Sequence, residues 1–125
     1  MALNKVYGIK PEENTCADLV PMSYFYFIIK NIEEIMTLML EKKYEDGRQP
    51  LLVHIDVLIM FIKKYPNTAS MCLSKIKRKQ IKKVFEEWWI RNEKKIPAKY
   101  RIGIRENADN LFNELMNVKT WEKSE

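Results

Sequence analysis

Apolar residues recur at three- and four-residue steps along most of the chain, a spacing typical of amphipathic α-helices. The first such segment spans about residues 18–44, and Gly47 is expected to supply the left-handed residue that caps its end. A second helix is predicted over 50–65, with Pro66 as its stop. Because that segment is apolar on nearly all sides, we expect it to be buried at the centre of the domain.

The second half of the chain shows the same periodicity with two interruptions. A third helix is predicted over 68–95, starting at Thr68, with lysines on one side and apolar residues on the other. A proline and then Gly103 break the pattern, leaving a short turn near 98–102. A fourth helix over 104–119 has a narrow apolar stripe, which is typical of a helix on the outside of a bundle.

Composition supports this assignment. Only three glycines and five prolines occur in 125 residues, too few for the many tight turns of a β-sandwich or barrel. The hydrophobic fraction of 46% is enough for one core and too high for a disordered chain. The sequence therefore predicts an all-α fold, a compact bundle of four main helices in a single domain spanning 1–125. Residues 1–14 are expected to form an arm and 121–125 a frayed tail.

Few enzyme chemistries find support in the residue types present. Cys16 and Cys72 are far apart and His54 is the only histidine, so a zinc site is not expected, and the thiols are expected to be reduced. The sequence has neither a Gly-rich phosphate loop nor a Glu-x-x-His pair. We therefore predict no catalytic residues, no metal, no cofactor and no small-molecule substrate. An enzyme that uses His54 is the hypothesis to discard first.

The longest apolar runs are shorter than the ~20 residues that a membrane-spanning helix needs, and the N-terminus has no apolar signal-peptide region. The expectation is an intracellular protein, cytoplasmic or nuclear, that is neither secreted nor transmembrane. The net charge of +5 permits a polyanionic partner without requiring one.

The strongest candidate for function is the segment 75–83, in which six of nine residues are basic. Placed on a helix, such residues can follow the phosphates of a nucleic acid, with affinity that falls as salt rises. The alternative is an ordinary solvated helix face, since Glu86 and Glu87 follow at once and offset the charge. The predicted nucleic-acid contacts are Lys75, Arg78, Lys79, Lys82, Lys83, Arg91, Lys94 and Lys95.

Two tryptophans follow the basic segment and point in different directions. Trp88 shares the apolar side of the helix and is expected in the core. Trp89 lies about 100° further round, nearer the basic edge, where an exposed ring can stack on an unpaired base. The alternative places Trp89 at the rim of the core.

The first helix carries a second apolar feature, because Phe27 and Leu38 project opposite its main stripe. They are either covered by the N-terminal arm or exposed as an interface for a protein partner or a homo-oligomer. Two functions are thus predicted from different classes. The first is a non-enzymatic nucleic-acid-binding module that uses the basic helix. The alternative is a protein-interaction module, such as an assembly subunit, adaptor or inhibitor, that uses Phe27 and Leu38 or the same basic face.

Overall fold

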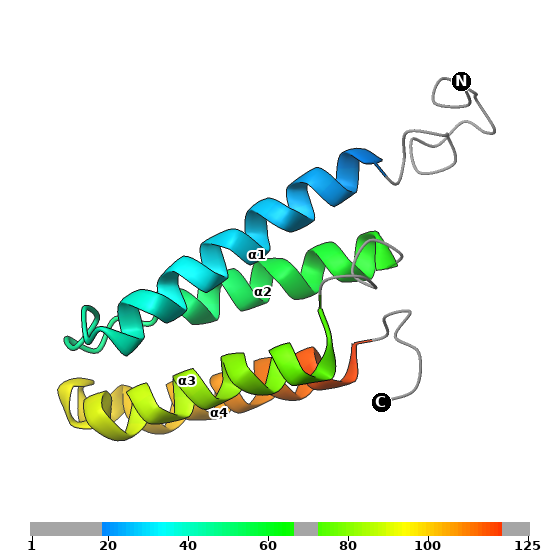
Figure 1. Cartoon of the computed structure of the whole chain (residues 1–125). Helices are drawn as coiled ribbons and strands as arrows, with labels where there is room; N and C mark the ends of the chain where they lie inside the picture. Colours follow the sequence, from blue (N-terminus) through cyan, green and yellow to red (C-terminus); the bar gives the residue numbers. More distant parts are fainter. Residues whose placement is uncertain (1–18, 67–72, 119–125) are drawn as a thin grey trace, which may run out of the picture.

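The computed structural model describes residues 19–66 and 73–118, and these residues form helices and connecting loops without a strand. The helices are α1 (Leu19–Leu40), α2 (Pro50–Lys64), α3 (Lys75–Asn92) and α4 (Ala98–Asn117), with a 3-10 turn, η5 (Glu93–Lys95), after α3. The predicted all-α class and the packing of four helices into one bundle are confirmed (Figure 1). The predicted arm at 1–14 and tail at 121–125 lie outside the described residues.

The four helices form two helical hairpins, and Figure 1 shows α1 and α2 stacked as a layer on α3 and α4. Ion pairs join the layers along both sides. Lys77 of α3 contacts Glu33 of α1, with Nζ and Oε1 2.7 Å apart, and Lys63 of α2 contacts Glu114 of α4 at 2.8 Å. Around the bundle the order is therefore α1, α2, α4, α3.

All four helices contribute to one apolar core. The largest side chains in it are aromatic, with the rings of Phe85 and Phe112 5.3 Å apart and those of Phe85 and Trp88 5.8 Å apart. Ring pairs at this separation add about 0.5–1.5 kcal/mol each beyond the area they bury. The first of these pairs joins α3 to α4, and the second lies within α3.

The predicted position of helix two is wrong in one respect. It forms one side of the bundle and is not surrounded, so Val53, Val57 and Met60 are exposed on its outer side. Burial on all sides was predicted because apolar residues surround this helix. The described helices form only two layers, so none of them covers the outer side of α2.

Helix α1 ends at Leu40, earlier than the predicted position near residue 44. Lys42 adopts a left-handed backbone with φ of 61°. The amide of Lys43 donates to the carbonyl of Leu38 at 2.9 Å, and that of Lys42 to Met39 at 3.0 Å. This pair of hydrogen bonds is a Schellman motif, which satisfies the last carbonyls of a helix. A lysine therefore takes the capping position predicted for Gly47, which lies further along the loop.

Helix α3 begins at Lys75, because Leu73 and Ser74 are not helical. The predicted start at Thr68 lies outside the described residues, and a helix continuous from there is excluded. Ser74 is the actual N-cap, since its Oγ accepts a hydrogen bond from the amide of Lys77 at 3.1 Å. At the other end, α3 stops at Asn92, and the last residues predicted to be α-helical form the 3-10 turn η5.

Helix α4 is continuous from Ala98, so the predicted turn at 98–102 is its first turn and Gly103 does not interrupt it. A glycine inside a helix costs about 1 kcal/mol relative to alanine, which packing elsewhere can offset. Arg101 supports this start, because its Nε donates to the carbonyl of Ile96 at 3.0 Å. Helix α4 ends at Asn117, before the predicted end at residue 119, because Val118 has an extended backbone.

Replacing Gly103 with alanine is expected to raise the free energy of unfolding by about 0.5–1 kcal/mol. A Cβ atom at this position would meet nothing within 4 Å. Gly47→Ala is the matched control and should destabilise the protein, because Gly47 has φ of +89° and its Cβ position is 3.4 Å from the Lys95 carbonyl. Urea unfolding of both variants and the wild type measures these changes. A free energy of unfolding for Gly103→Ala below that of the wild type would contradict the expectation.

Within residues 19–66 and 73–118, none of the helices combines the length and the apolar character needed to cross a membrane.

Candidate functional site

The structure corrects the predicted basic stripe at Arg78. The side chain of Arg78 is only 1% exposed and lies on the core side of α3. Its Nη1 donates to the carbonyls of Met116 at 3.3 Å and Val118 at 3.2 Å, and its Nη2 donates to Leu73 at 3.2 Å. Arg78 therefore caps the carboxyl end of α4, where the helix dipole favours a positive charge. It cannot contact a phosphate in solution.

Trp89 is also not the exposed ring that stacking requires. Its side chain is buried, and the guanidinium of Arg105 covers it at 5.4 Å from the ring centroid. Arg105 is held in place by Glu86, with Nη2 and Oε1 2.6 Å apart. The predicted alternative, a tryptophan at the rim of the core, describes the observed position.

Two further predicted cations bind the loop between α1 and α2. Arg91 donates from Nε to the carboxylate of Glu45 at 2.9 Å and from Nη2 to the Met39 carbonyl at 3.2 Å. Lys95 donates to the Glu45 carbonyl, and the buried Asn92 donates to the Glu45 carboxylate at 2.6 Å. Burial raises the pKa of Glu45, but the hydrogen bonds from Asn92 and Arg91 and the charges of Arg91 and Lys95 outweigh it and lower the pKa overall. This cluster fastens the loop to the end of α3.

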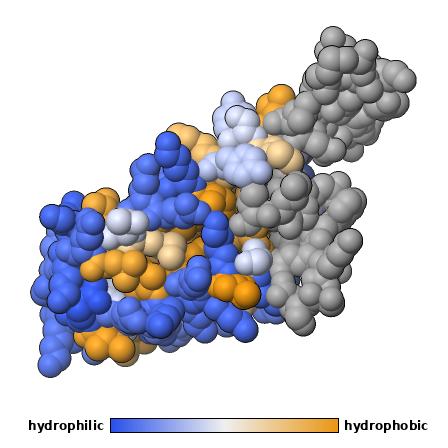
Figure 2. Space-filling model, in the orientation of Figure 1, coloured by the Kyte–Doolittle hydropathy of each residue, from blue (hydrophilic) through white to orange (hydrophobic). Residues whose placement is uncertain are grey.

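The remaining predicted cations do lie on the surface. They are Lys75, Lys79, Lys82, Lys83 and Lys94, all exposed. Figure 2 shows hydrophilic residues over most of the layer formed by α3 and α4, the lower layer in Figure 1. Four of the five lie in the first half of α3, whose first turn contains no acidic residue. Their charges add to the positive end of the helix dipole, so this end of α3 attracts anions.

The predicted apolar feature on α1 is present. Phe27 is 66% exposed, and Leu38 is partly buried. Val20 and Tyr24 are also exposed and extend the same row, because residues 20, 24 and 27 follow four- and three-residue helical steps and residue 38 lies eleven residues, or about three turns, further on. The buried Ile32 gives the direction of the core from α1. Around the helix axis, Leu38 is rotated from Ile32 by about 120° in one direction and Glu33 by about 100° in the other. Because Glu33 contacts Lys77 of α3, the side of α1 that carries Leu38 is the side towards α2.

A matching row on α2 was missed by the sequence analysis. Val53, Val57 and Met60 are 64%, 45% and 64% exposed. At 100° per residue they lie between about 140° and 200° round the helix from the buried Ile55, on the side away from the core. Their spacing of four and three residues was a usable signal, but the apolar character of the whole helix obscured it.

The two rows lie on adjacent helices and are together named the α1–α2 outer face; on α1, the polar Asn31 and Glu34 separate Phe27 from Leu38. Two half-buried side chains, His54 and Phe61, lie between the rows on the α1 side of α2. The face consists of Val20, Tyr24, Phe27 and Leu38 of α1 and Val53, Val57 and Met60 of α2. Exposed apolar side chains that gather on one side of a molecule often mark interaction sites.

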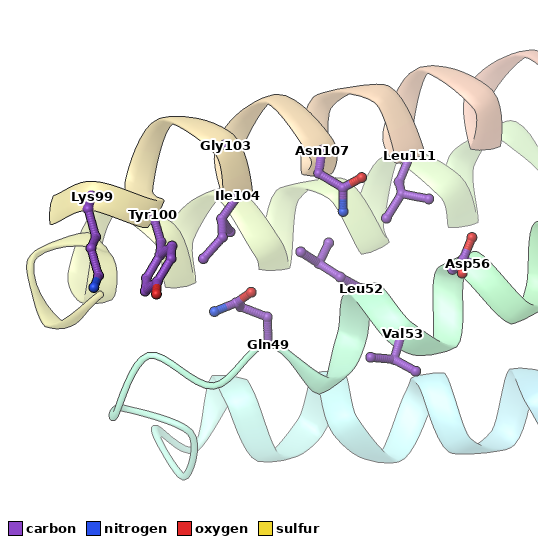
Figure 3. Close-up of a pocket in the computed structure, with 10 residues that line it drawn as sticks. All are labelled: Gln49, Leu52, Val53, Asp56, Lys99, Tyr100, Gly103, Ile104, Asn107 and Leu111. Atoms are coloured by element: carbon purple, nitrogen blue, oxygen red, sulfur yellow. The ribbon is translucent and has the colours of Figure 1, made fainter. Parts of the chain in front are cut away.

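A groove of about 550 Å³ lies between α2 and α4 (Figure 3). Leu52, Ile104 and Leu111 supply apolar lining, and Gly103 leaves room for it. Lys99 stands at one end and Asp56 at the other, as Figure 3 shows, and His54 does not line it. The lining of the groove contains no serine, cysteine or histidine side chain. Among the described residues, no three or more His, Cys, Asp or Glu side chains gather in a way that could hold a metal ion.

Comparison of the chain with protein-family models, with curated proteins and with solved structures finds no match.

Proposed function

We propose that this chain is a non-enzymatic protein-interaction module that binds its partner through the α1–α2 outer face. The observation that carries the proposal is the exposure of seven apolar side chains in two adjacent rows on this face, only one of them partly buried. Full burial of a side chain such as valine, phenylalanine or methionine contributes about 1.5–3 kcal/mol. A partner that covers several of them thus gains enough free energy to offset part of the entropic cost of association.

The surroundings of the face also fit an interface. Lys30 is exposed beside the α1 row and Asp56 beside the α2 row, while Glu34 lies within the α1 row and Lys64 ends the α2 row. An apolar centre with a charged rim is the usual anatomy of protein interfaces. The basic surface of α3 lies in the other layer, so its lysines and the outer face can act independently.

The test compares Phe27→Gln/Met60→Gln with Ile90→Gln/Ile102→Gln. The control pair removes side chains of equal character on α3 and α4, which are 76% and 74% exposed. Immobilised chains are offered a differently tagged copy of the protein and, separately, a cell extract. We expect the wild type and the control to retain the same proteins and the face variant to lose them. Equal retention by the face variant, or retention by none of the three, would overturn the proposal.

A second candidate is nucleic-acid binding by the surface lysines of α3, supported by Lys79, Lys82 and Lys83 lying exposed on one side of the helix. With Arg78 buried and both Arg91 and Lys95 bound to Glu45, the surface is smaller than predicted. We therefore expect weak, sequence-independent binding.

The measurement is fluorescence anisotropy with a labelled single-stranded oligonucleotide at two salt concentrations. Lys79→Glu/Lys82→Glu/Lys83→Glu should abolish binding. In the wild type, affinity should fall as salt rises, because each phosphate contact releases counterions. Absence of binding by the wild type at low salt eliminates this candidate.

A further inference from the structure

We infer that the partner on the α1–α2 outer face is a second copy of this chain, with α2 of each copy packed antiparallel against α2 of the other. The inference rests on the proposed function, because it names the occupant of the same face. Three features carry it: the spacing of the exposed residues of α2, the charges beside them, and the area of the α1–α2 outer face.

The spacing is that of a coiled-coil seam. Val53, Val57, Met60 and Lys64 follow one another at steps of four, three and four residues on the side of α2 away from the core. This is the repeat that places alternate residues of two helices in contact along their length. Because core residues such as Ile55 and Ile62 occupy the opposite side of the helix, Val53, Val57 and Met60 stay exposed within the copy to which they belong.

Lys64 decides the relative direction of the two helices. A parallel pair would place each seam residue opposite its own equivalent, so the two Lys64 ammonium groups would meet and repel. An antiparallel pair places Val57 opposite Met60 of the second copy and Lys64 opposite Val53. The aliphatic stem of lysine can lie across a valine while its charge reaches water. The antiparallel arrangement also opposes the two helix dipoles favourably.

The charges beside the seam support the same direction. Asp56 and Lys63 lie seven residues apart, on the same side of the seam, towards α4. In the antiparallel pair, Asp56 of each copy faces Lys63 of the other, which gives two symmetric ion pairs. Lys63 already contacts Glu114, but its side chain is 64% exposed and its ammonium group can donate to a second carboxylate. On the other side of the seam, His54 of one copy faces Phe61 of the other.

The area fits a reversible dimer. The 22 residues of α1 and 15 of α2 give lengths of about 33 Å and 22 Å at 1.5 Å per residue. Two adjacent helices are roughly 20 Å wide, so the face offers on the order of 500 Å² per copy, or about 1,000 Å² in total. That area is near the lower limit for a specific interface, where association is usually weak and concentration-dependent.

The closing experiment measures the dissociation constant of the full-length chain by sedimentation under reducing conditions, with folding checked by circular dichroism. Val57→Glu places a charge in the centre of the seam and should weaken the dimer at least about a hundredfold. The control Ile90→Glu introduces the same charge at an exposed isoleucine of α3 and should leave the dissociation constant unchanged.

Charge reversal tests the antiparallel register. Asp56→Lys and Lys63→Glu, made singly, should each weaken the dimer about tenfold, because each creates two like-charge contacts per dimer. The double variant restores opposite charges and should return to within about threefold of wild type. A dimer indifferent to Val57→Glu, or a double variant as weak as the singles, overturns the inference.

A wild type that stays monomeric at high concentration also overturns the inference. In that case the proposed function still holds if the wild type retains a different protein and the Phe27→Gln/Met60→Gln variant does not.

Discussion

Replacing Arg78 with methionine is expected to lower the free energy of unfolding by about 3–5 kcal/mol. The methionine side chain fills most of the space of the arginine stem but donates no hydrogen bond. The carbonyls of Leu73, Met116 and Val118 would then lose their guanidinium partner. Each buried acceptor left unpaired costs about 1–3 kcal/mol. The loss is large because one buried side chain joins the start of α3 to the end of α4.

Urea unfolding followed by circular dichroism gives the comparison, with Lys79→Met as the matched control. Lys79 is the next residue along α3 and is exposed, so its replacement should change stability by less than about 0.5 kcal/mol. If Arg78→Met proved as mild as Lys79→Met, the structural role assigned to Arg78 would be wrong.

The second large effect is expected at Trp88. Truncation to alanine should cost about 3–5 kcal/mol, because the indole is fully buried and packs against Phe85. Its Nε1 also donates to the carbonyl of Tyr44 at 2.6 Å, which holds the loop after α1 against α3. Trp88→Phe keeps an aromatic ring and removes this donor, so we expect a smaller loss of about 1–2 kcal/mol.

Amide hydrogen exchange separates the two contributions of Trp88. With the donor removed, amides of the loop 41–49 should exchange faster in Trp88→Phe than in wild type, while the centres of the helices remain protected. Unchanged exchange in the loop would show that ring packing alone accounts for the stabilisation by Trp88.

The helices themselves were predictable from local chemistry. The three- and four-residue apolar spacing identifies every helix of the described chain, and Pro50 and Pro66 bracket α2 correctly. The helix ends were less predictable, because several residues compete for each cap. Ser74 took the N-cap of α3, and Lys42 adopted the left-handed conformation expected of Gly47. Single caps differ by only about 1 kcal/mol, so tertiary contacts choose among them.

The candidate sites were predictable only in part. Phe27 was identified as projecting opposite a clear apolar stripe, but its exposure was left open, because the sequence does not show what covers that side of α1. Arg78 was misplaced and Trp89 was left between two positions, because both lie near the boundary between the polar and apolar sides of α3, where periodicity alone does not decide burial. Helix α4 decides both positions, since its last carbonyls accept from Arg78 and its Arg105 covers Trp89. The α2 row was missed because apolar residues on all sides of a helix leave no contrast from which to read direction.

The sequence by itself determined that this protein is helical, where its helices lie, and that α3 carries a basic face, since each of these follows from contacts within a few residues. Only the tertiary structure decided which apolar and basic residues remain exposed. Burial depends on which helices become neighbours, and that depends on contacts between residues far apart in the chain, such as Glu45 with Arg91 and Lys63 with Glu114. The order α1, α2, α4, α3 covers Arg78 and leaves Val57 and Met60 in water. For that reason the surface on which we base the proposed function includes α2, a helix whose pattern predicted burial at the centre of the domain.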